Sequence, residues 1–442
     1  MKKRNFFNLA VVFFLIIALT APAFANFARP GHAALAVVLS DKTTGDIIFA
    51  ENEHTPLHPA STTKVMTALL AVEALDRGDI SIADLLTVTP AALADMVPAG
   101  SNIGLEVGEQ MSFEALLFSI MLESANDASN VLAEYLGGTI SGFIEMMNER
   151  AVQLGARNTN FMNPHGLTQD GHVSTAYDIF RISQYAIQNP RFVELYSWQE
   201  RPHAATNMRA AGFFTSTNQL TNPESPYYFS GASGVKTGFT SASGHSLIST
   251  ATRSDISLMA VVMGVAPNQE GVTHFTESAL LYNWVFENFT HQELFPAGHE
   301  ITSVPIALGS DTATIGLLLD RSASALVHIG TDPSTDMQQE ITLFSEEAGE
   351  PLTAPIQQGD ILGELLLHAE GRTFAPIPLI ASESVSISRL SYFQSEFENT
   401  FSSLWVRLVI VALLILVTLY IVYTIRFNMR KRRQRRARLR RR

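Results

Sequence analysis

The chain has 442 residues, of which 46% are hydrophobic and 16% charged, so it can form folded cores and is not a disordered chain. It contains no cysteine, which excludes disulfide frameworks, thiolate zinc sites and cysteine catalysis. The length favours two to three domains.

The net charge of −12 conceals two oppositely charged parts of the chain. Residues 26–403 contain 15 basic side chains against all 42 acidic ones, a net charge of −27, whereas 11 basic residues lie from Arg426 onward. A strongly acidic body binds polyanions poorly, which argues against a nucleic-acid partner.

Both ends of the sequence predict an exported protein held in the cell membrane. Basic residues 2–4 precede an apolar stretch and an A-x-A site, so residues 1–25 are expected to be a cleaved signal peptide, with an uncleaved anchor as the alternative. Residues 404–425 are apolar enough to form a single transmembrane helix, and the basic tail 426–442 is expected to stay in the cytoplasm.

A β-hairpin is expected over residues 34–50, and a helix follows over residues 65–75, with Ser61 at or near its first turn. Ser61-Thr62-Thr63-Lys64 opens this helix, and Gly78 supplies its stop. Lys64 follows Ser61 by three positions, so both lie on one helix face, as a nucleophile beside a candidate base. An N-capping serine with a solvated lysine is the alternative interpretation.

The next elements expected are two short extended pieces and two helices, at residues 86–89, 101–105, 113–122 and 128–136. A polar step, Glu123-Ser124-Ala125-Asn126-Asp127, separates the two helices. Such a step often presents side chains into a cleft, and an ordinary helix cap is the alternative. His165 lies in a Pro/Gly turn, where a structural role is favoured over that of a catalytic base.

Lys236-Thr237-Gly238 begins a region expected to contain strands at 246–251 and 258–263, followed by a helix at 274–289. This order indicates an α/β (α+β) layer fold with helices against an antiparallel sheet. A lysine beside glycine on an inner strand leaves room for a ligand along the backbone. An edge-strand lysine that discourages aggregation is the alternative.

The pattern changes near Pro296. Short β-like runs alternate with turns over residues 300–380, which predicts a small all-β sandwich at 299–385 without a cluster of catalytic residue types. Aromatic residues then recur at helical spacing, so residues 386–403 are expected to form an amphipathic helix along the membrane.

Three short motifs occur in a defined order: Ser61-x-x-Lys64, Ser124-x-Asn126 and Lys236-Thr237-Gly238. The exported body has only three lysines, and two of them lie in these motifs. With them, the chain resembles the low-molecular-mass penicillin-binding proteins, the D-alanyl-D-alanine carboxypeptidases of serine peptidase family S11. The resemblance covers about residues 30–385 and includes the segments 58–64, 123–128, 161–167, 234–240 and 354–360.

The resemblance implies a penicillin-binding, serine β-lactamase-like catalytic domain at residues 26–293, in which helices flank an antiparallel sheet. It also implies a β-rich C-terminal domain and a membrane attachment. Family members often carry Gly where Ala125 stands, and some carry His where Phe239 stands. Many relatives have only an amphipathic helix, whereas this chain adds a full span and a basic tail.

The resemblance further implies acyl transfer on peptides that end in D-Ala-D-Ala. Ser61 would attack the penultimate carbonyl after Lys64 takes its proton, and Ser124 with Asn126 would relay the proton and hold the peptide. The substrate carboxylate is expected at Lys236 and Thr237, next to Gly238.

Backbone N–H groups of Ser61 and Phe239 would form the oxyanion hole. The implied partners are peptidoglycan stem peptides, β-lactam inhibitors and the membrane, with no metal and no cofactor. A D,D-endopeptidase, a β-lactamase and a membrane-held wall-binding scaffold are the alternatives. Against a class A β-lactamase, no Glu-x-x-Leu-Asn motif lies between Ser124 and Lys236.

Overall fold

The computed structural model describes residues 29–97, 100–267, 270–310, 312–369, 371–390, 392–393 and 404–439. The predicted signal peptide and most of the predicted segment 386–403 lie outside these residues. The chain divides into two compact units. One contains residues up to Glu293 with Ser324–Gln338 and Leu367–Ala375, and the other contains the remainder. The domain boundaries expected at 293 and 299 stay predictions.

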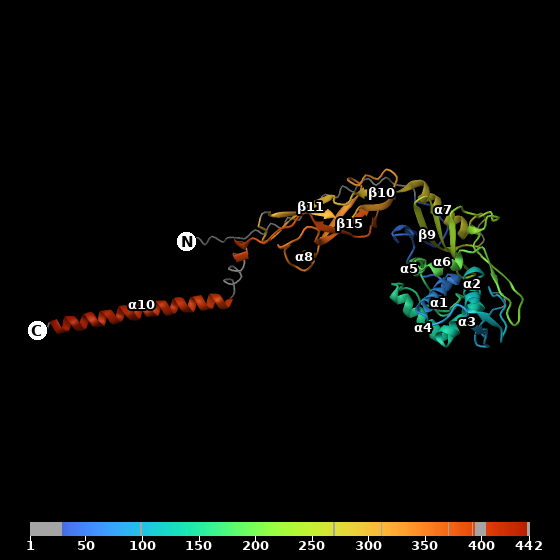
Figure 1. Ribbon diagram of the computed structural model, residues 1–442, viewed down its shortest axis with the longest axis horizontal. Helices are drawn as coiled ribbons and strands as arrows, with labels where there is room; N and C mark the ends of the chain where they lie inside the picture. The colour runs from blue at the N-terminus through green and yellow to red at the C-terminus, as the bar shows by residue number, and fades with distance from the viewer. Residues whose placement is uncertain are drawn as a thin grey trace, which may run out of the picture. The chain divides into compact units, whose positions relative to one another are not determined.

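The first unit is built around a five-stranded antiparallel sheet with the strand order β2-β1-β9-β8-β7. Its strands are β1 (Ala36–Asp41), β2 (Ile47–Glu51), β7 (Ala232–Thr240), β8 (Gly244–Arg253) and β9 (Ile256–Val265). Val38 and Val261 pack with helices on one face, while Val37 and Val262 pack against α7 (His274–Asn288) on the other (Figure 1). Burial on both faces explains why β9 and the first four residues of β1 are almost continuously apolar.

The other helices of this unit follow from local capping signals as much as from apolar spacing. They are α1 (Lys64–Arg77), α2 (Phe113–Leu122), α3 (Asn126–Gly137), α4 (Ile140–Gln153), α5 (Ala176–Ala186) and α6 (Pro190–Tyr196). Ser112, Thr139, Thr175 and Asn189 cap α2, α4, α5 and α6, because each side chain accepts a hydrogen bond from a first-turn amide.

Short hairpins complete the first unit: β3 (Leu85–Thr87) pairs with β4 (Gln110–Ser112), and β5 (Glu200–His203) pairs with β6 (Gly212–Thr215). Residues 101–105, expected to be extended, do not form a strand. Amides of this segment donate hydrogen bonds to the Asp127 side chain, as described below, and β3 pairs instead with β4.

The second unit contains most of a six-stranded sheet. Five of its strands follow the order β11-β12-β17-β15-β14, and the sixth, the short β16, pairs with β15. The strands are β11 (Glu300–Pro305), β12 (Thr314–Leu319), β14 (Gln338–Leu343), β15 (Ile361–Ala369), β16 (Arg372–Thr373) and β17 (Ile377–Ala381). A one-turn helix, α8 (Phe344–Glu347), follows β14, and β10 (Phe289–Phe295) pairs with β13 (Ala323–His328).

The last helix, α10 (Leu404–Leu439), includes a candidate membrane span at Trp405–Arg432, whose most apolar 18-residue window has a mean hydropathy of 2.9 (Figure 1). About 20 apolar residues cross the hydrocarbon core of a bilayer, so this helix is long enough to do so.

Candidate active site

Ser61 lies in a 3-10 turn, Ala60–Thr63, immediately before α1, which agrees with its predicted place at or near the first turn of the helix. Ala60 adopts a positive φ of 49°. Gly166 packs on the Ala60 carbonyl so closely that a Cβ there would overlap its oxygen. On the other side, Gly238 leaves room for the Ser61 amide, which would lie 3.3 Å from a Cβ at 238. Two glycines therefore set the position of Ser61.

Lys64 begins α1 and is completely buried. Its Nζ contacts Ser61 Oγ at 3.1 Å, Asn126 Oδ1 at 2.7 Å and the carbonyl oxygen of His165 at 2.6 Å. Burial, and then the charge of Lys236, lower the pKa of Lys64 well below its usual value, while Asp127 opposes the shift.

The contacts of Lys64 decide where a neutral amine directs its lone pair. Asn126 Oδ1 and the His165 carbonyl are acceptors only, so they take the two N–H groups of the neutral amine. The lone pair is left for the Ser61 hydroxyl. This geometry suits proton transfer from Ser61 to Lys64.

The polar step between α2 and α3 is a kink that turns Ser124 into the cleft. Ser124 is buried and adopts a left-handed φ of 64°. The amides on both sides of it, at Glu123 and Ala125, donate to the Ser119 carbonyl at 3.1 and 3.2 Å. The Asn126 amide instead donates to Ser101 at 2.7 Å.

Asp127, the next residue, fixes the loop that faces this kink. Its carboxylate accepts hydrogen bonds from the amides of Ile103, Gly104 and Leu105 at 3.2, 2.9 and 3.0 Å. These bonds take the place of strand pairing, which is why residues 101–105 are irregular. The sequence placed Asp127 in the polar step but gave it no role.

Lys236 lies on β7, the strand at the end of the described sheet order. Its side chain is 1% exposed, and its Nζ donates to the Thr237 carbonyl at 3.0 Å. Burial lowers the pKa of Lys236 to about 7. Thr237 Oγ1 lies 2.6 Å from Thr217 Oγ1, a partner that the sequence did not indicate.

A cleft of about 500 Å³ unites the predicted residues. Its lining includes six of them: Ser61, Ser124, Asn126, Thr237, Gly238 and Phe239. Lys64 lies behind Ser61 and Asn126, and Lys236 adjoins Thr237 on β7. Among the described residues, no group of three or more His, Asp or Glu side chains is placed to hold a metal ion.

His165 supports the site from its turn, in keeping with the structural role expected for it. Its carbonyl oxygen accepts a hydrogen bond from Lys64 Nζ, while its Nε2 lies 3.3 Å from Asp95 Oδ2. Leu167 donates its amide to His165 Nδ1 at 3.2 Å, so Nε2 carries the proton toward Asp95. Asn130 Nδ2 donates a hydrogen bond to the other Asp95 oxygen, Oδ1, at 2.7 Å.

His172 is a second supporting residue, and sequence reasoning missed it. Its Nδ1 accepts the Met162 amide at 2.9 Å, which leaves Nε2–H to donate to Thr63 Oγ1 at 2.9 Å. Thr63 belongs to the turn that carries Ser61. The two residues are 109 positions apart, so no local pattern connects them.

Aromatic rings line one end of the cleft, a feature that the motifs do not indicate. Phe239 is 48% exposed and stacks on His245 with ring centroids 4.3 Å apart. His245 in turn stacks on His274 at 4.9 Å. Burial lowers the pKa of His274 to about 3, so this ring is neutral at physiological pH.

Comparison with known proteins agrees with this site. The sequence profile of peptidase family S11, D-alanyl-D-alanine carboxypeptidase, matches residues 24–267. The chain is 32% identical to D-alanyl-D-alanine carboxypeptidase DacF of Bacillus subtilis, over 80% of this chain and 86% of that protein. It is 32% identical to DacA of Haemophilus influenzae, over 78% of this chain and 84% of that protein.

Solved structures lead to the same family. The fold is similar to that of penicillin-binding protein 5 from Haemophilus influenzae, with a TM-score of 0.64 and 29% identity, covering 81% of this chain and 99% of that one. Penicillin-binding protein 6B from Escherichia coli gives a TM-score of 0.58 at 28% identity, over 80% and 96% of the two chains. The chain therefore belongs to peptidase family S11, the D-alanyl-D-alanine carboxypeptidases.

Proposed function

We propose that this protein is a serine D-Ala-D-Ala carboxypeptidase that removes the terminal D-alanine from peptidoglycan stem pentapeptides. The observation that carries the proposal is the arrangement of Lys64, whose two acceptor partners leave its lone pair for Ser61. Family membership supplies the substrate class, and β-lactams are the expected inhibitors.

In the acylation step, Ser61 Oγ attacks the carbonyl carbon of the penultimate D-Ala while Lys64 Nζ takes the hydroxyl proton. The C–N bond then breaks, and the proton passes to the leaving amine, with Ser124 as the relay. The amides of Ser61 and Phe239 stabilise the oxyanion; removing one such donor typically costs a hundredfold or more in rate. Water then cleaves the ester and regenerates Ser61, with Lys64 again as the base.

The positive charge on Lys236 and the hydroxyl of Thr237 hold the terminal carboxylate of the substrate. This contact explains a requirement for a free C-terminus. Asn126, already bonded to Lys64, holds the peptide backbone on the opposite side of Ser61. Gly238 has no side chain to obstruct a ligand, so the substrate peptide can lie along β7 at the edge of the sheet.

We also propose that α10 anchors the protein as a single span, with the catalytic unit outside the cell and the basic tail in the cytoplasm. The uncharged apolar run at residues 408–425 supports the span, and the cluster of positive charges that begins at Arg426 supports this orientation.

The test uses the full chain in detergent micelles with a pentapeptide ending in D-Ala-D-Ala. We expect release of D-alanine that benzylpenicillin blocks, and loss of both release and penicillin labelling in Ser61→Ala. The exposed Ser141→Ala of α4 is the matched control and should behave as wild type. Release that survives in Ser61→Ala would overturn the mechanism.

Two other outcomes would replace the proposal with its alternatives. Stable penicillin labelling at Ser61 without D-alanine release would indicate an endopeptidase or a binding role. Rapid hydrolysis of benzylpenicillin would indicate a β-lactamase.

A further inference from the structure

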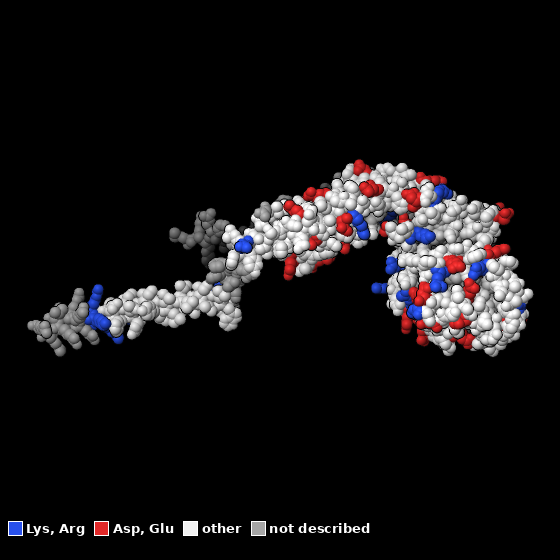
Figure 2. Space-filling model, in the orientation of Figure 1, with Lys and Arg blue, Asp and Glu red and all other residues white. Residues whose placement is uncertain are grey.

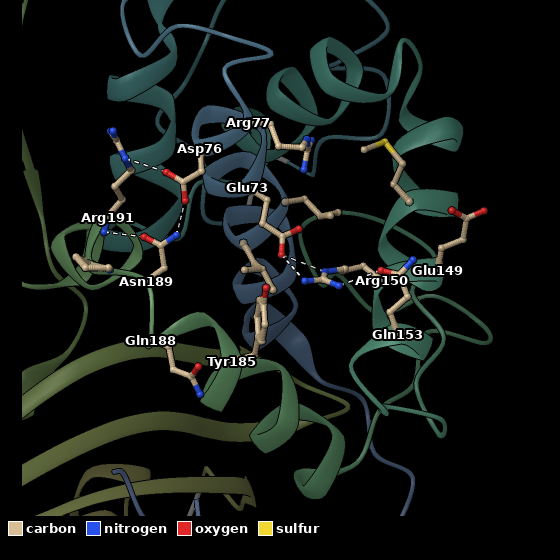
Figure 3. Close-up of a pocket in the computed structure, with 14 residues that line it drawn as sticks. Glu73, Asp76, Arg77, Glu149, Arg150, Gln153, Tyr185, Gln188, Asn189 and Arg191 are labelled. Atoms are coloured by element: carbon tan, nitrogen blue, oxygen red, sulfur yellow. Dashed lines mark hydrogen bonds and ion pairs between the residues drawn. The ribbon is translucent and has the colours of Figure 1, made fainter. Parts of the chain in front are cut away.

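A second groove lies in the first unit, among α1, α4, α5 and α6 (Figure 3). Its main pocket has a volume of about 960 Å³, within the range of ligand sites. An adjoining pocket of about 540 Å³ extends it to the turn at residues 43–45. The two pockets share Arg150, Gln153, Tyr185 and Gln188, so they form one elongated groove. None of the predicted catalytic residues lines either pocket.

Charges in the main pocket balance. Three acidic and three basic side chains line it: Glu73, Asp76, Glu149, Arg77, Arg150 and Arg191. Arg150 Nη2 lies 2.6 Å from Glu73 Oε1, and Arg191 Nε lies 3.0 Å from Asp76 Oδ1. Figure 2 shows acidic and basic side chains intermixed over α1, α4 and α5, with no patch of one sign. A strongly charged ligand would compete with these two ion pairs, whereas an uncharged ligand leaves both intact, so the pairs favour an uncharged one.

Hydrogen-bonding capacity nevertheless remains in the groove. Both bonds from Arg150 to Glu73 end on Oε1, and the second oxygen, Oε2, points away from Arg150 in Figure 3. Gln153 uses its Oε1 to accept from Arg150 Nη1 at 2.9 Å, which leaves its amide N–H groups for a ligand. Gln188 is exposed and adds a further amide. The groove thus offers both donors and acceptors to a ligand.

The pocket also has an apolar side. Leu69, Leu70 and Met146 line it, and the ring of Tyr185 is 43% exposed, with Arg150 over it at 4.8 Å from the centroid. A sugar ring matches this lining, because each hydroxyl both donates and accepts hydrogen bonds while the C–H face of the ring is apolar. Two connected pockets suit several sugar units in a row better than a single small molecule.

We propose that this groove binds an uncharged amino-sugar oligosaccharide, and that its occupant is the glycan of the wall polymer. The choice of this glycan rests on the proposed function, which places the enzyme on that polymer. The groove then holds the glycan while the cleft at Ser61 receives stem peptides, so one chain recognises both components of the polymer.

The experiment titrates the full chain in detergent micelles with chitotetraose, an uncharged N-acetylglucosamine oligomer that carries no peptide. We expect saturable binding by calorimetry that weakens about three- to tenfold in Gln153→Ala and in Gln188→Ala, the loss from one or two neutral hydrogen bonds. The exposed Gln339→Ala of the second unit is the matched control and should bind as wild type. Binding should change little between low and high salt, because chitotetraose carries no charge.

Absence of saturable binding, or binding that both groove variants leave unchanged, would overturn the proposal. So would tighter binding of tetralysine or tetraglutamate than of chitotetraose, since the proposed occupant is uncharged. D-alanine release is measured on the same samples. Groove-dependent binding without release would refute only the carboxypeptidase function, and release without binding would refute only the glycan site.

Discussion

Gly166 lies against the carbonyl of Ala60, the residue immediately before the proposed nucleophile Ser61, although Gly166 and Ala60 are far apart in the sequence. Gly166 also has a positive φ of 91°. In Gly166→Ala the new Cβ would push the Ala60 carbonyl away and move Ser61 relative to Lys64. We expect D-alanine release to fall at least about a hundredfold, because misplacement by roughly 1 Å has that effect.

The control for this variant is Gly171→Ala. Gly171 has a similar φ of 81°, but a Cβ there would meet only ordinary contacts with Asn160 and Met162. It should lose stability through backbone strain and keep its activity. D-alanine release from the pentapeptide and thermal unfolding are measured for both variants. If both lose the same activity, backbone strain and not the position of Ser61 causes the loss.

Lys236 should set the alkaline limit of activity. Burial lowers its pKa to about 7, so the free enzyme loses the charge that holds the substrate carboxylate as the pH rises through 7. We expect kcat/KM to fall above about pH 7, and to fall on the acid side as Lys64 gains a proton. Lys236→Arg keeps its charge and should move the alkaline limb to higher pH. A limb at the same pH in this variant would exclude Lys236 as its origin.

His172 should make the fold sensitive to acid. Burial lowers its pKa to about 3, below the 6.5 of an exposed imidazole, so below pH 6.5 the unfolded chain binds the extra proton. The contribution of neutral His172 to stability is full above pH 6.5 and is lost as the pH falls toward 3. His172→Gln, which cannot titrate, should remove on the order of 3 kcal/mol of the difference in unfolding free energy between pH 7 and pH 4.

Urea unfolding at both pH values measures this difference. The exposed His54→Gln is the control and should leave the pH dependence of wild type intact. If His172→Gln also leaves it intact, another group is responsible, and His274, whose pKa is also lowered to about 3, is the next to change.

Asp127 should contribute both to the stability of the fold and to the basicity of Lys64. Asp127→Asn replaces a carboxylate that receives the amides of 103–105 with an amide that can satisfy only part of them, so we expect a loss of about 2–3 kcal/mol. It also removes a charge that raises the pKa of Lys64, so the acid limb of kcat/KM should move to lower pH. The exposed Asp170→Asn should change neither quantity. A purely structural role would leave the acid limb in place.

Local signals predicted much of the fold. The helix expected at 113–122 coincides with α2, because Ser112 supplies a cap and the apolar run that follows is unbroken. The expected helix at 274–289 matches α7 within one residue for the same reason, with Thr273 as its cap. The strands at 246–251 and 258–263 lie inside β8 and β9, although each strand is longer at both ends.

What the sequence could not predict depends on partners far along the chain. The turn at Ser61 is 3-10 because Gly166 and Gly238 confine it, and residues 101–105 avoid a strand because Asp127 binds their amides. The order of the motifs indicated which residues to group around the cleft. It contained no information on His172 or Asp95, which hold Thr63 and His165 in place.

The scarcity of lysine has a practical consequence. Of the three lysines in residues 26–403, Lys64 and Lys236 are at most 1% exposed, whereas Lys42 follows β1 and is partly exposed. Amine-reactive reagents should therefore couple to the body at Lys42 and at the chain's N-terminal amine, and spare the cleft. A dye, a biotin or a solid support attached in this way would leave the cleft chemically untouched and would be confined to two known points of the body.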